Sequence, residues 1–120
     1  CDIVEFHHKR KADAPSGTAM NLGMAIAEGR GHALADRAVF ARHGQVGARG
    51  EQEIGFAALR GGDVVGEHTV IFATDGERLE LTHRATSRDI FARGALAAAI
   101  WLARREPRMY NFDEVLAPSA

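Results

Sequence analysis

The chain has 120 residues, of which 46% are apolar and 26% are charged, and its formal net charge is −1. This length suits one domain, and this composition excludes a disordered or collagen-like chain. The near-zero charge argues against nucleic-acid binding. The single cysteine, Cys1, excludes an internal disulfide and a zinc site built from several cysteines.

The sequence also bears on location and completeness. The longest uninterrupted apolar run, residues 95–103, is too short to span a bilayer, and no segment has the basic amphipathic pattern of a membrane-surface helix. We see no signal peptide at the start of the chain, and we expect a cytoplasmic location. Because the chain begins with Cys1 and not with Met, we expect it to be part of a longer protein.

The first half of the chain predicts a strand, a helix and two further strands. Residues 2–7 alternate loosely and include β-branched side chains, which favours a short strand. After a polar loop, Ser16 is a good N-cap for a helix that ends at the glycines at 29 and 31. Residues 38–42 and 53–59 predict two strands, and the glycine-rich residues 43–50 between them predict a loop.

The second half predicts a hairpin followed by a helix. Residues 64–74 and 78–84 form the strands, joined by an Asp-Gly turn. Residues 64–74 carry apolar side chains on both faces, so the uncovered face of the sheet is expected to pack on another subunit. The helix is capped by Thr86 or Ser87, and it is so apolar that we expect it to pack against more protein than this chain supplies. Residues 111–120 predict a tail.

This order of elements places the chain in the α+β class. We expect a mixed open sheet of about four main strands, with one face covered by a helix. The sequence contains no internal repeat and no low-complexity segment.

Chemistry-bearing residues gather in residues 5–18. This segment holds two histidines, His7 and His8, a run of basic residues that ends at Lys11, and the start of the first helix. Free backbone N–H groups at a helix start bind anions, and a histidine at a strand end can transfer a proton near neutral pH. Together these features suit a small anionic substrate that is protonated during its reaction.

Plainer interpretations of the same residues stay open. A His-His pair is often part of a solvated loop, Ser-Gly-Thr after proline is often only a capped helix, and a basic run is usually a solvated face. The other four histidines lack the spacing of metal ligands, so we expect no metal site. The glycines at 44, 47 and 50 do not form a dinucleotide-binding turn, so we expect no cofactor on this chain by itself.

Residues 5–18 read E-x-H-H-x-x-K-x-D-x-P-S-G-T, which closely resembles the signature of the 4-hydroxy-tetrahydrodipicolinate reductases, also called dihydrodipicolinate reductases. Further matches follow at residues 55–56, 60–62, 65–68, 76–83 and 87–88, so the resemblance covers essentially the whole chain.

The resemblance implies an oxidoreductase of lysine and diaminopimelate biosynthesis that uses NADPH or NADH to form tetrahydrodipicolinate. Enzymes of this family are homotetramers with a Rossmann domain that holds the cofactor. Residues 1–87 would be the substrate-binding and tetramerisation domain. Residues 88–120 would be a helix and tail that pack on the absent nucleotide-binding domain, and the chain alone would be inactive.

The resemblance also assigns roles to individual residues. His7 would be the catalytic acid/base and Lys11 the general acid. A small dicarboxylate substrate would be held by the remaining residues of the motif, namely His8, Ser16, Gly17 and Thr18. The alternative is a stand-alone oligomerisation or anion-binding module that kept the fold and lost the reaction, and the length of the natural gene product distinguishes the two.

Overall fold

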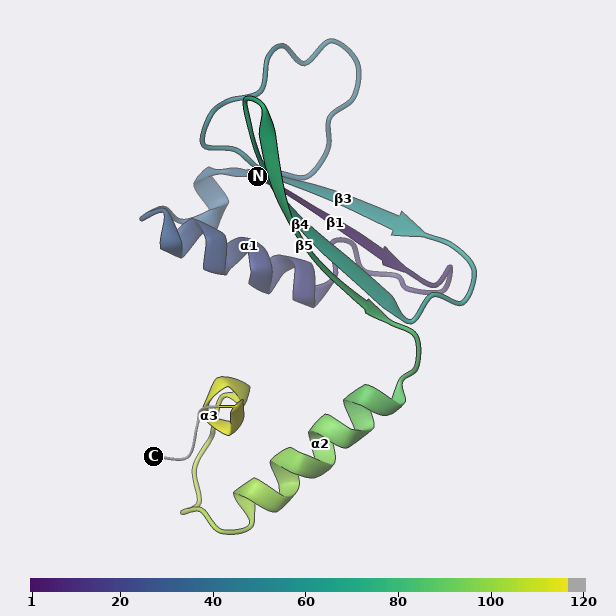
Figure 1. The fold of residues 1–120 in the computed structure, drawn as a ribbon, viewed down its shortest axis with the longest axis vertical. Helices are drawn as coiled ribbons and strands as arrows, with labels where there is room; N and C mark the ends of the chain where they lie inside the picture. Colours follow the sequence, from purple (N-terminus) through teal and green to yellow (C-terminus); the bar gives the residue numbers. More distant parts are fainter. Residues whose placement is uncertain (117–120) are drawn as a thin grey trace. The chain divides into compact units, whose positions relative to one another are not determined.

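The computed structural model describes residues 1–116 and divides into two compact units, Cys1–Thr86 and Ser87–Ala120 (Figure 1). The functional assignment of residues 1–87 and 88–120 stays a prediction, and the last four residues of the second range lie outside the described residues.

The first unit is built on one mixed five-stranded sheet. Its strand order is β2-β3-β1-β4-β5, in which β2, β3 and β1 are parallel, β4 is antiparallel to β1, and β5 is antiparallel to β4. The strands are β1 (Asp2–His7), β2 (Ala38–Val39), β3 (Ile54–Arg60), β4 (Gly66–Thr74) and β5 (Glu77–Ala85). The α+β prediction is confirmed, with β2 as a short fifth strand at one edge.

The prediction of a strand over residues 38–42 is wrong beyond Val39. β2 ends at Val39, and residues 40–53 form a long irregular connection. Arg42 and Arg49 hold this connection through ion pairs with Asp2, and Arg42 also pairs with Glu53. Side-chain ion pairs therefore replace the sheet hydrogen bonds that a longer β2 would have made.

Helix α1 (Gly17–Gly29) covers one face of the sheet (Figure 1). Ser16 is its N-cap, and Gly31 follows its end with a φ of 71°, a conformation that favours glycine. Its buried stripe consists of Ala19, Gly23 and Ala27. A Cβ added at Gly23 would lie 2.6 Å from the Phe56 ring, so these small residues let α1 pack closely on the sheet.

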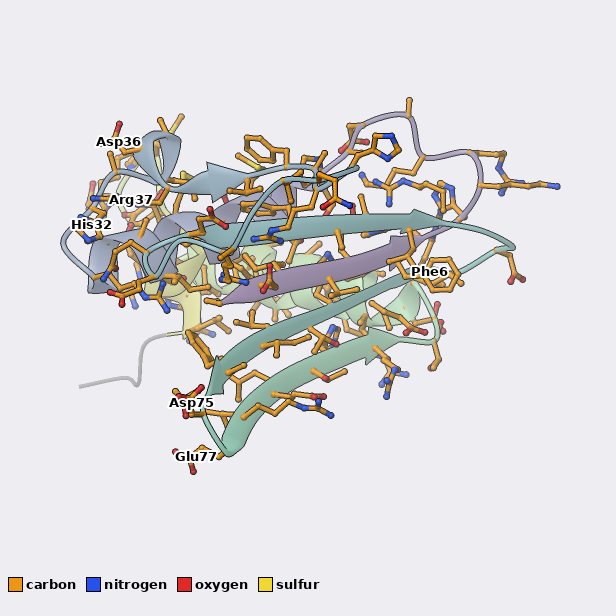
Figure 2. All side chains as sticks on the ribbon, turned by 90° about the horizontal axis from the view of Figure 1, so that it is seen from above. Phe6, His32, Asp36, Arg37, Asp75 and Glu77 are labelled. Carbon is orange, nitrogen blue, oxygen red and sulfur yellow. The ribbon has the colours of Figure 1, made fainter. Side chains whose placement is uncertain are left out.

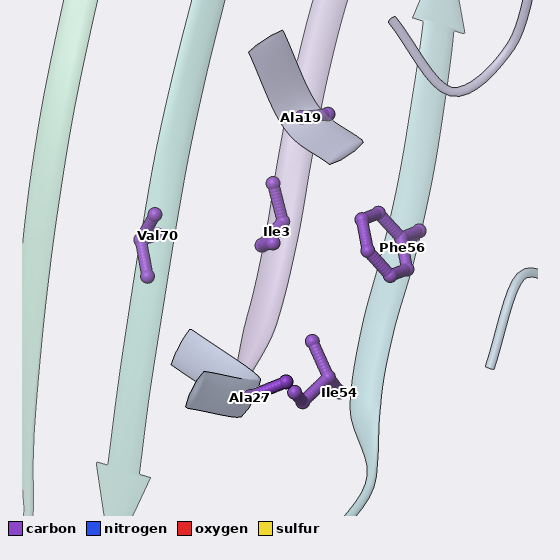
Figure 3. Close-up of a cluster of buried hydrophobic side chains, with 6 residues drawn as sticks. All are labelled: Ile3, Ala19, Ala27, Ile54, Phe56 and Val70. Atoms are coloured by element: carbon purple, nitrogen blue, oxygen red, sulfur yellow. The ribbon is translucent and has the colours of Figure 1, made fainter. Parts of the chain in front are cut away.

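The core lies between α1 and the three central strands. Ala19 and Ala27 reach down from α1, and the apolar side chains beneath them come from β1, β3 and β4 (Figure 3). Those side chains are Ile3, Ile54, Phe56 and Val70. Because side chains alternate along a strand, the residues on β1 that share the Ile3 face are Glu5 and His7.

The opposite face of the sheet has no covering helix within this unit. Val4, Phe6 and Ile71 are half-buried there, and Leu59 is 44% exposed. In Figure 2 Phe6 lies at the far end of the sheet from the hairpin turn that carries Asp75 and Glu77. Apolar groups therefore occupy both faces of β4, as the pattern of residues 64–74 predicts.

The second unit contains α2 (Asp89–Leu102) and the short helix α3 (Phe112–Leu116). The sequence pattern predicts only a tail over residues 111–120 and no helix at the position of α3. The N-cap position of α2 falls on Arg88, although the Ser87 hydroxyl accepts a hydrogen bond from the Asp89 N–H at 3.1 Å. Within residues 1–116 no helix is long and apolar enough to cross a membrane.

Candidate active site

A buried carboxylate organises the end of β1. Glu5 is 1% exposed, and its Oε2 lies 2.5 Å from Nδ1 of His7, two residues further along the same face of the strand. Arg60, at the end of the neighbouring strand β3, donates to both oxygens of Glu5 at 2.8 Å. The backbone N–H of Ser16 donates to Oε1 at 3.1 Å. Glu5 thereby connects β1, β3 and the start of α1.

This environment keeps Glu5 ionised. Burial by itself would raise the pKa of its carboxyl, but the hydrogen bonds from Arg60, His7 and the Ser16 N–H outweigh burial and lower that pKa below its usual range. The same pairing raises the pKa of Arg60. Arg60 also donates to the carbonyl of Asp13 at 2.6 Å, which ties the loop before α1 to the sheet.

Ser16 joins the start of α1 to β4. Its Oγ accepts from the Ala19 N–H at 3.2 Å, as an N-cap does, and lies 3.0 Å from Nε2 of His68. Burial, and next the neighbouring His7, lower the pKa of His68, so its ring is neutral near pH 7. Ser16 can therefore donate its hydroxyl proton to His68 while it accepts from the helix.

The first turn of α1 leaves two donors free. Within residues 1–116 the backbone N–H groups of Gly17 and Thr18 have no acceptor, and nothing lies within 4 Å of the position of a Cβ on Gly17. Thr18 is exposed and lines a pocket of about 460 Å³ together with His68 and His83. Free N–H groups at a helix start can bind an anion, although the carboxylate of Glu80 also lines this pocket.

The rings of His7 and His68 meet edge to face, with centroids 5.1 Å apart. Gly66 lies opposite the end of β1, and a Cβ there would be only 3.1 Å from Nε2 of His7. The lack of a side chain at this position avoids a close contact with that nitrogen.

Of the predicted site residues, the structure links His7 with Ser16, Gly17 and Thr18, whereas Lys11 pairs within its own loop. Through Glu5 and His68, the structure connects His7 to Ser16, the residue just before the free N–H groups of Gly17 and Thr18. His8 follows β1, and within residues 1–116 its buried Nδ1 has no hydrogen-bond partner. The ammonium of Lys11 bonds to both oxygens of Asp13 at 2.8 Å, so in this structure it pairs with its own loop.

Three residues of the site were not predicted to belong to it, namely Glu5, Arg60 and His68. Glu5 begins the motif and lies two residues before His7, so strand alternation alone could have placed both on one face. His68 lies opposite Glu5 on β4, and Arg60 lies beside His7 on β3. Those two neighbours depend on strand pairing, for which the local sequence carries no signal.

The described residues contain no group of three or more His, Cys, Asp or Glu side chains that could hold a metal ion.

Comparisons with known proteins show the family of the chain. Residues 1–116 match the family model described as the C-terminus of dihydrodipicolinate reductase. Proteins named 4-hydroxy-tetrahydrodipicolinate reductase from Magnetococcus marinus and Pseudomonas fluorescens are each 56% identical to the chain over 115 residues, which is 96% of the chain. The chain spans 43% of the length of each of these relatives.

A solved structure has the same fold. It is a dipicolinate-bound dihydrodipicolinate reductase from Paenisporosarcina sp. TG-14, with a TM-score of 0.66 and 23% identity. The match covers 94% of this chain and 43% of that one. The match over residues 1–116 shows that this chain belongs to the dihydrodipicolinate reductase C-terminal family.

Proposed function

We propose that this chain is the substrate-binding and catalytic part of a 4-hydroxy-tetrahydrodipicolinate reductase, which forms tetrahydrodipicolinate with NADPH or NADH in lysine and diaminopimelate biosynthesis. One observation carries the proposal. Glu5 bonds both to the His7 imidazole and to the Ser16 N–H, so the proton donor and the free N–H groups of Gly17 and Thr18 belong to one connected site.

The substrate is a small dicarboxylate, the class to which the dipicolinate named for the Paenisporosarcina structure belongs. One of its carboxylates binds at the N–H groups of Gly17 and Thr18, where the helix dipole adds about 0.3–1 kcal/mol, and more when the site is partly buried. The Thr18 hydroxyl and the Ser16 hydroxyl border the same position. The orphaned Nδ1 of His8 supplies a further polar contact.

The reaction requires a proton as well as a hydride. Two residues supply protons to the substrate ring after its reduction. One is His7, whose Nε2 no side chain at position 66 covers. The other is Lys11, on the loop that precedes α1. Lys11 exchanges its pairing with Asp13 for a substrate carboxylate, and its charge also attracts the dicarboxylate. We therefore assign both a binding role and a proton-donating role to Lys11.

The residues of this chain do not fit a nicotinamide cofactor. The segment between β1 and α1, residues 8–16, contains no glycine, whereas a dinucleotide-binding turn between a strand and a helix needs several. We assign the cofactor to the remaining length of the full enzyme, and we assign no step of hydride delivery to residues of this chain.

The same proposal extends to assembly and location. The uncovered sheet face, with Val4, Phe6 and Ile71, forms the interface of a homotetramer, because a symmetric oligomer buries such a face against its own copy. We assign the enzyme to the cytoplasm, where it binds neither nucleic acid nor membranes.

A reductase assay on the full-length protein tests the proposal. His7→Ala and Lys11→Ala should each lower kcat by about 10²–10⁴-fold, because a proton donor acts in the transition state. Thr18→Val should mainly raise KM, because a group that holds a carboxylate contacts the ground state and the transition state alike. A full-length protein that does not reduce the substrate with either cofactor would refute the proposal.

A further inference from the structure

Glu5 has no part in the chemistry proposed above, yet it is the most completely bonded side chain of the site. Its Oε1 accepts from the Ser16 N–H and from Nη2 of Arg60, and its Oε2 accepts from Nη1 of Arg60 and from Nδ1 of His7. A carboxylate that is 1% exposed is costly to bury unless it is paired and fully hydrogen-bonded, and Glu5 meets both conditions.

The bonding pattern determines where the proton of His7 lies. An ionised carboxylate can only accept hydrogen bonds, so the proton in the 2.5 Å contact between Glu5 and His7 belongs to Nδ1 of the imidazole. The neutral ring of His7 then carries its lone pair on Nε2. Arg60 supports this arrangement because its guanidinium, bound through two nitrogens, keeps Glu5 ionised.

The geometry also determines where Nε2 lies. It is next to Gly66 of β4, the strand that carries His68, and no side chain at 66 covers it. His68 in turn contacts Ser16, the residue before the two free N–H groups. The His7 ring is therefore linked to the two free N–H groups through His68 and Ser16.

We propose that Glu5 is a positioning residue, whose carboxylate holds His7 in the Nδ1–H tautomer and, through the Ser16 N–H, sets the start of α1 at a constant place relative to Nε2 of that ring. This inference rests on the proposed function. When the imidazolium of His7 gives its Nε2 proton to the substrate, the Nδ1 proton stays on the ring, directed at Glu5. The ring becomes neutral in the tautomer that Glu5 already favours, so no rearrangement accompanies the transfer.

Glu5→Gln is a sharp probe of this role. A glutamine can keep its oxygen toward the Ser16 N–H and Nη2 of Arg60, and it then places an NH₂ group where Oε2 stood. That group faces both Nδ1–H of His7 and Nη1 of Arg60 as donor against donor, so the substitution acts on the tautomer of His7 and removes one of the two bonds from Arg60, while it preserves the link to α1.

The experiment is a double-mutant cycle on the full-length enzyme, with kcat and KM measured for wild type, Glu5→Gln, His7→Ala and the double variant. Glu5→Gln should lower kcat by about 10- to 100-fold with little change in KM, because orientation is lost while the substrate contacts stay. In the His7→Ala background the same change should alter kcat by less than about twofold, because Glu5 acts through His7. Glu28→Gln, an exposed position on α1, is the matched control and should change neither constant.

The outcomes separate this inference from the function on which it rests. A wild-type enzyme without reductase activity would refute the proposed function and the inference together. If His7→Ala loses activity and folded Glu5→Gln keeps its kcat, or if the two losses simply multiply, then only the positioning role is wrong. Circular dichroism monitors folding. Should Glu5→Gln not fold, Glu5→Asp, whose shorter carboxylate withdraws from Nδ1, enters the same cycle with the same expectation.

Discussion

Oγ of Ser16 lies 3.0 Å from Nε2 of His68, although 52 positions of sequence separate the two residues. The same oxygen accepts the hydrogen bond that caps α1. One hydroxyl therefore stabilises the helix, satisfies a half-buried histidine of β4 and borders the proposed carboxylate receptor. A structural role and a binding role coincide at Ser16, and each can be measured separately.

Ser16→Ala should reduce both stability and substrate affinity. Loss of the cap lowers the free energy of unfolding by about 1 kcal/mol, and more if His68 is left without its partner. Loss of the hydroxyl should also raise KM. Urea unfolding followed by circular dichroism measures the first effect, and steady-state kinetics of the full-length enzyme measure the second. Ser16→Thr keeps the hydroxyl and should restore most of the stability, and an equal loss in both variants would show that the cap is unimportant.

His68 should make stability depend on pH below about 6.5, the usual pKa of a histidine. Burial, and then the neighbouring His7, lower the pKa of folded His68, while Glu5 opposes this shift and His83 of β5 adds to it. Between the folded and unfolded pKa values the unfolded chain binds a proton that the folded chain does not. The contribution of His68 is therefore fully present above about pH 6.5 and is lost as the pH falls.

A comparison of wild type with His68→Gln tests this dependence. Free energies of unfolding are measured at about pH 7.5 and about pH 5.5, and the drop between them should be smaller in the variant. The difference between the two drops belongs to His68 and the groups around it. An identical drop in the two proteins would contradict the assignment.

Gly66→Ala should impair His7 without unfolding the protein. Gly66 does not have a positive φ, so alanine is compatible with the backbone, but the new Cβ would lie 3.1 Å from Nε2 of His7 and 3.4 Å from Cδ2. The ring must shift by a few tenths of an ångström, which we expect to lower kcat by roughly tenfold. Gly29→Ala, where nothing lies within 4 Å of the Cβ position, is the control. Equal kcat values for the two variants would show that a Cβ next to Nε2 of His7 does not impair this residue.

Ile71→Lys should dissociate the proposed tetramer. Ile71 is half-buried on the sheet face opposite α1, and a lysine there would bring charges together across a symmetric interface. Light scattering of the full-length protein should report a smaller species than wild type. Glu28→Lys, on the exposed side of α1, introduces the same residue away from this face and should leave the mass unchanged. A tetramer that persists with Ile71→Lys would place the interface elsewhere.

Features that depend on neighbouring residues could be predicted from the sequence. The N-cap at Ser16, the Asp-Gly turn of the hairpin and the apolar alternation of β4 follow from local backbone and side-chain preferences, and the structure confirms them. The motif at residues 5–18 pointed to the family in the same way, because its residues are contiguous in the chain. The short β2 was mispredicted, since ion pairs from Arg42 and Arg49 to Asp2 involve residues distant in sequence.

The groups that surround His7 depend on the tertiary structure and could not be predicted from the sequence. The pairing of β1 with β3 and β4 brings Arg60 and His68 to the face that carries Glu5 and His7, and no local pattern encodes that register. A shift of one residue in either pairing would send these side chains to the opposite face. The buried apolar pattern at Ile3, Phe56 and Val70 holds the register, because any slip would expose the core. The packing of the core thus determines which groups surround the imidazole.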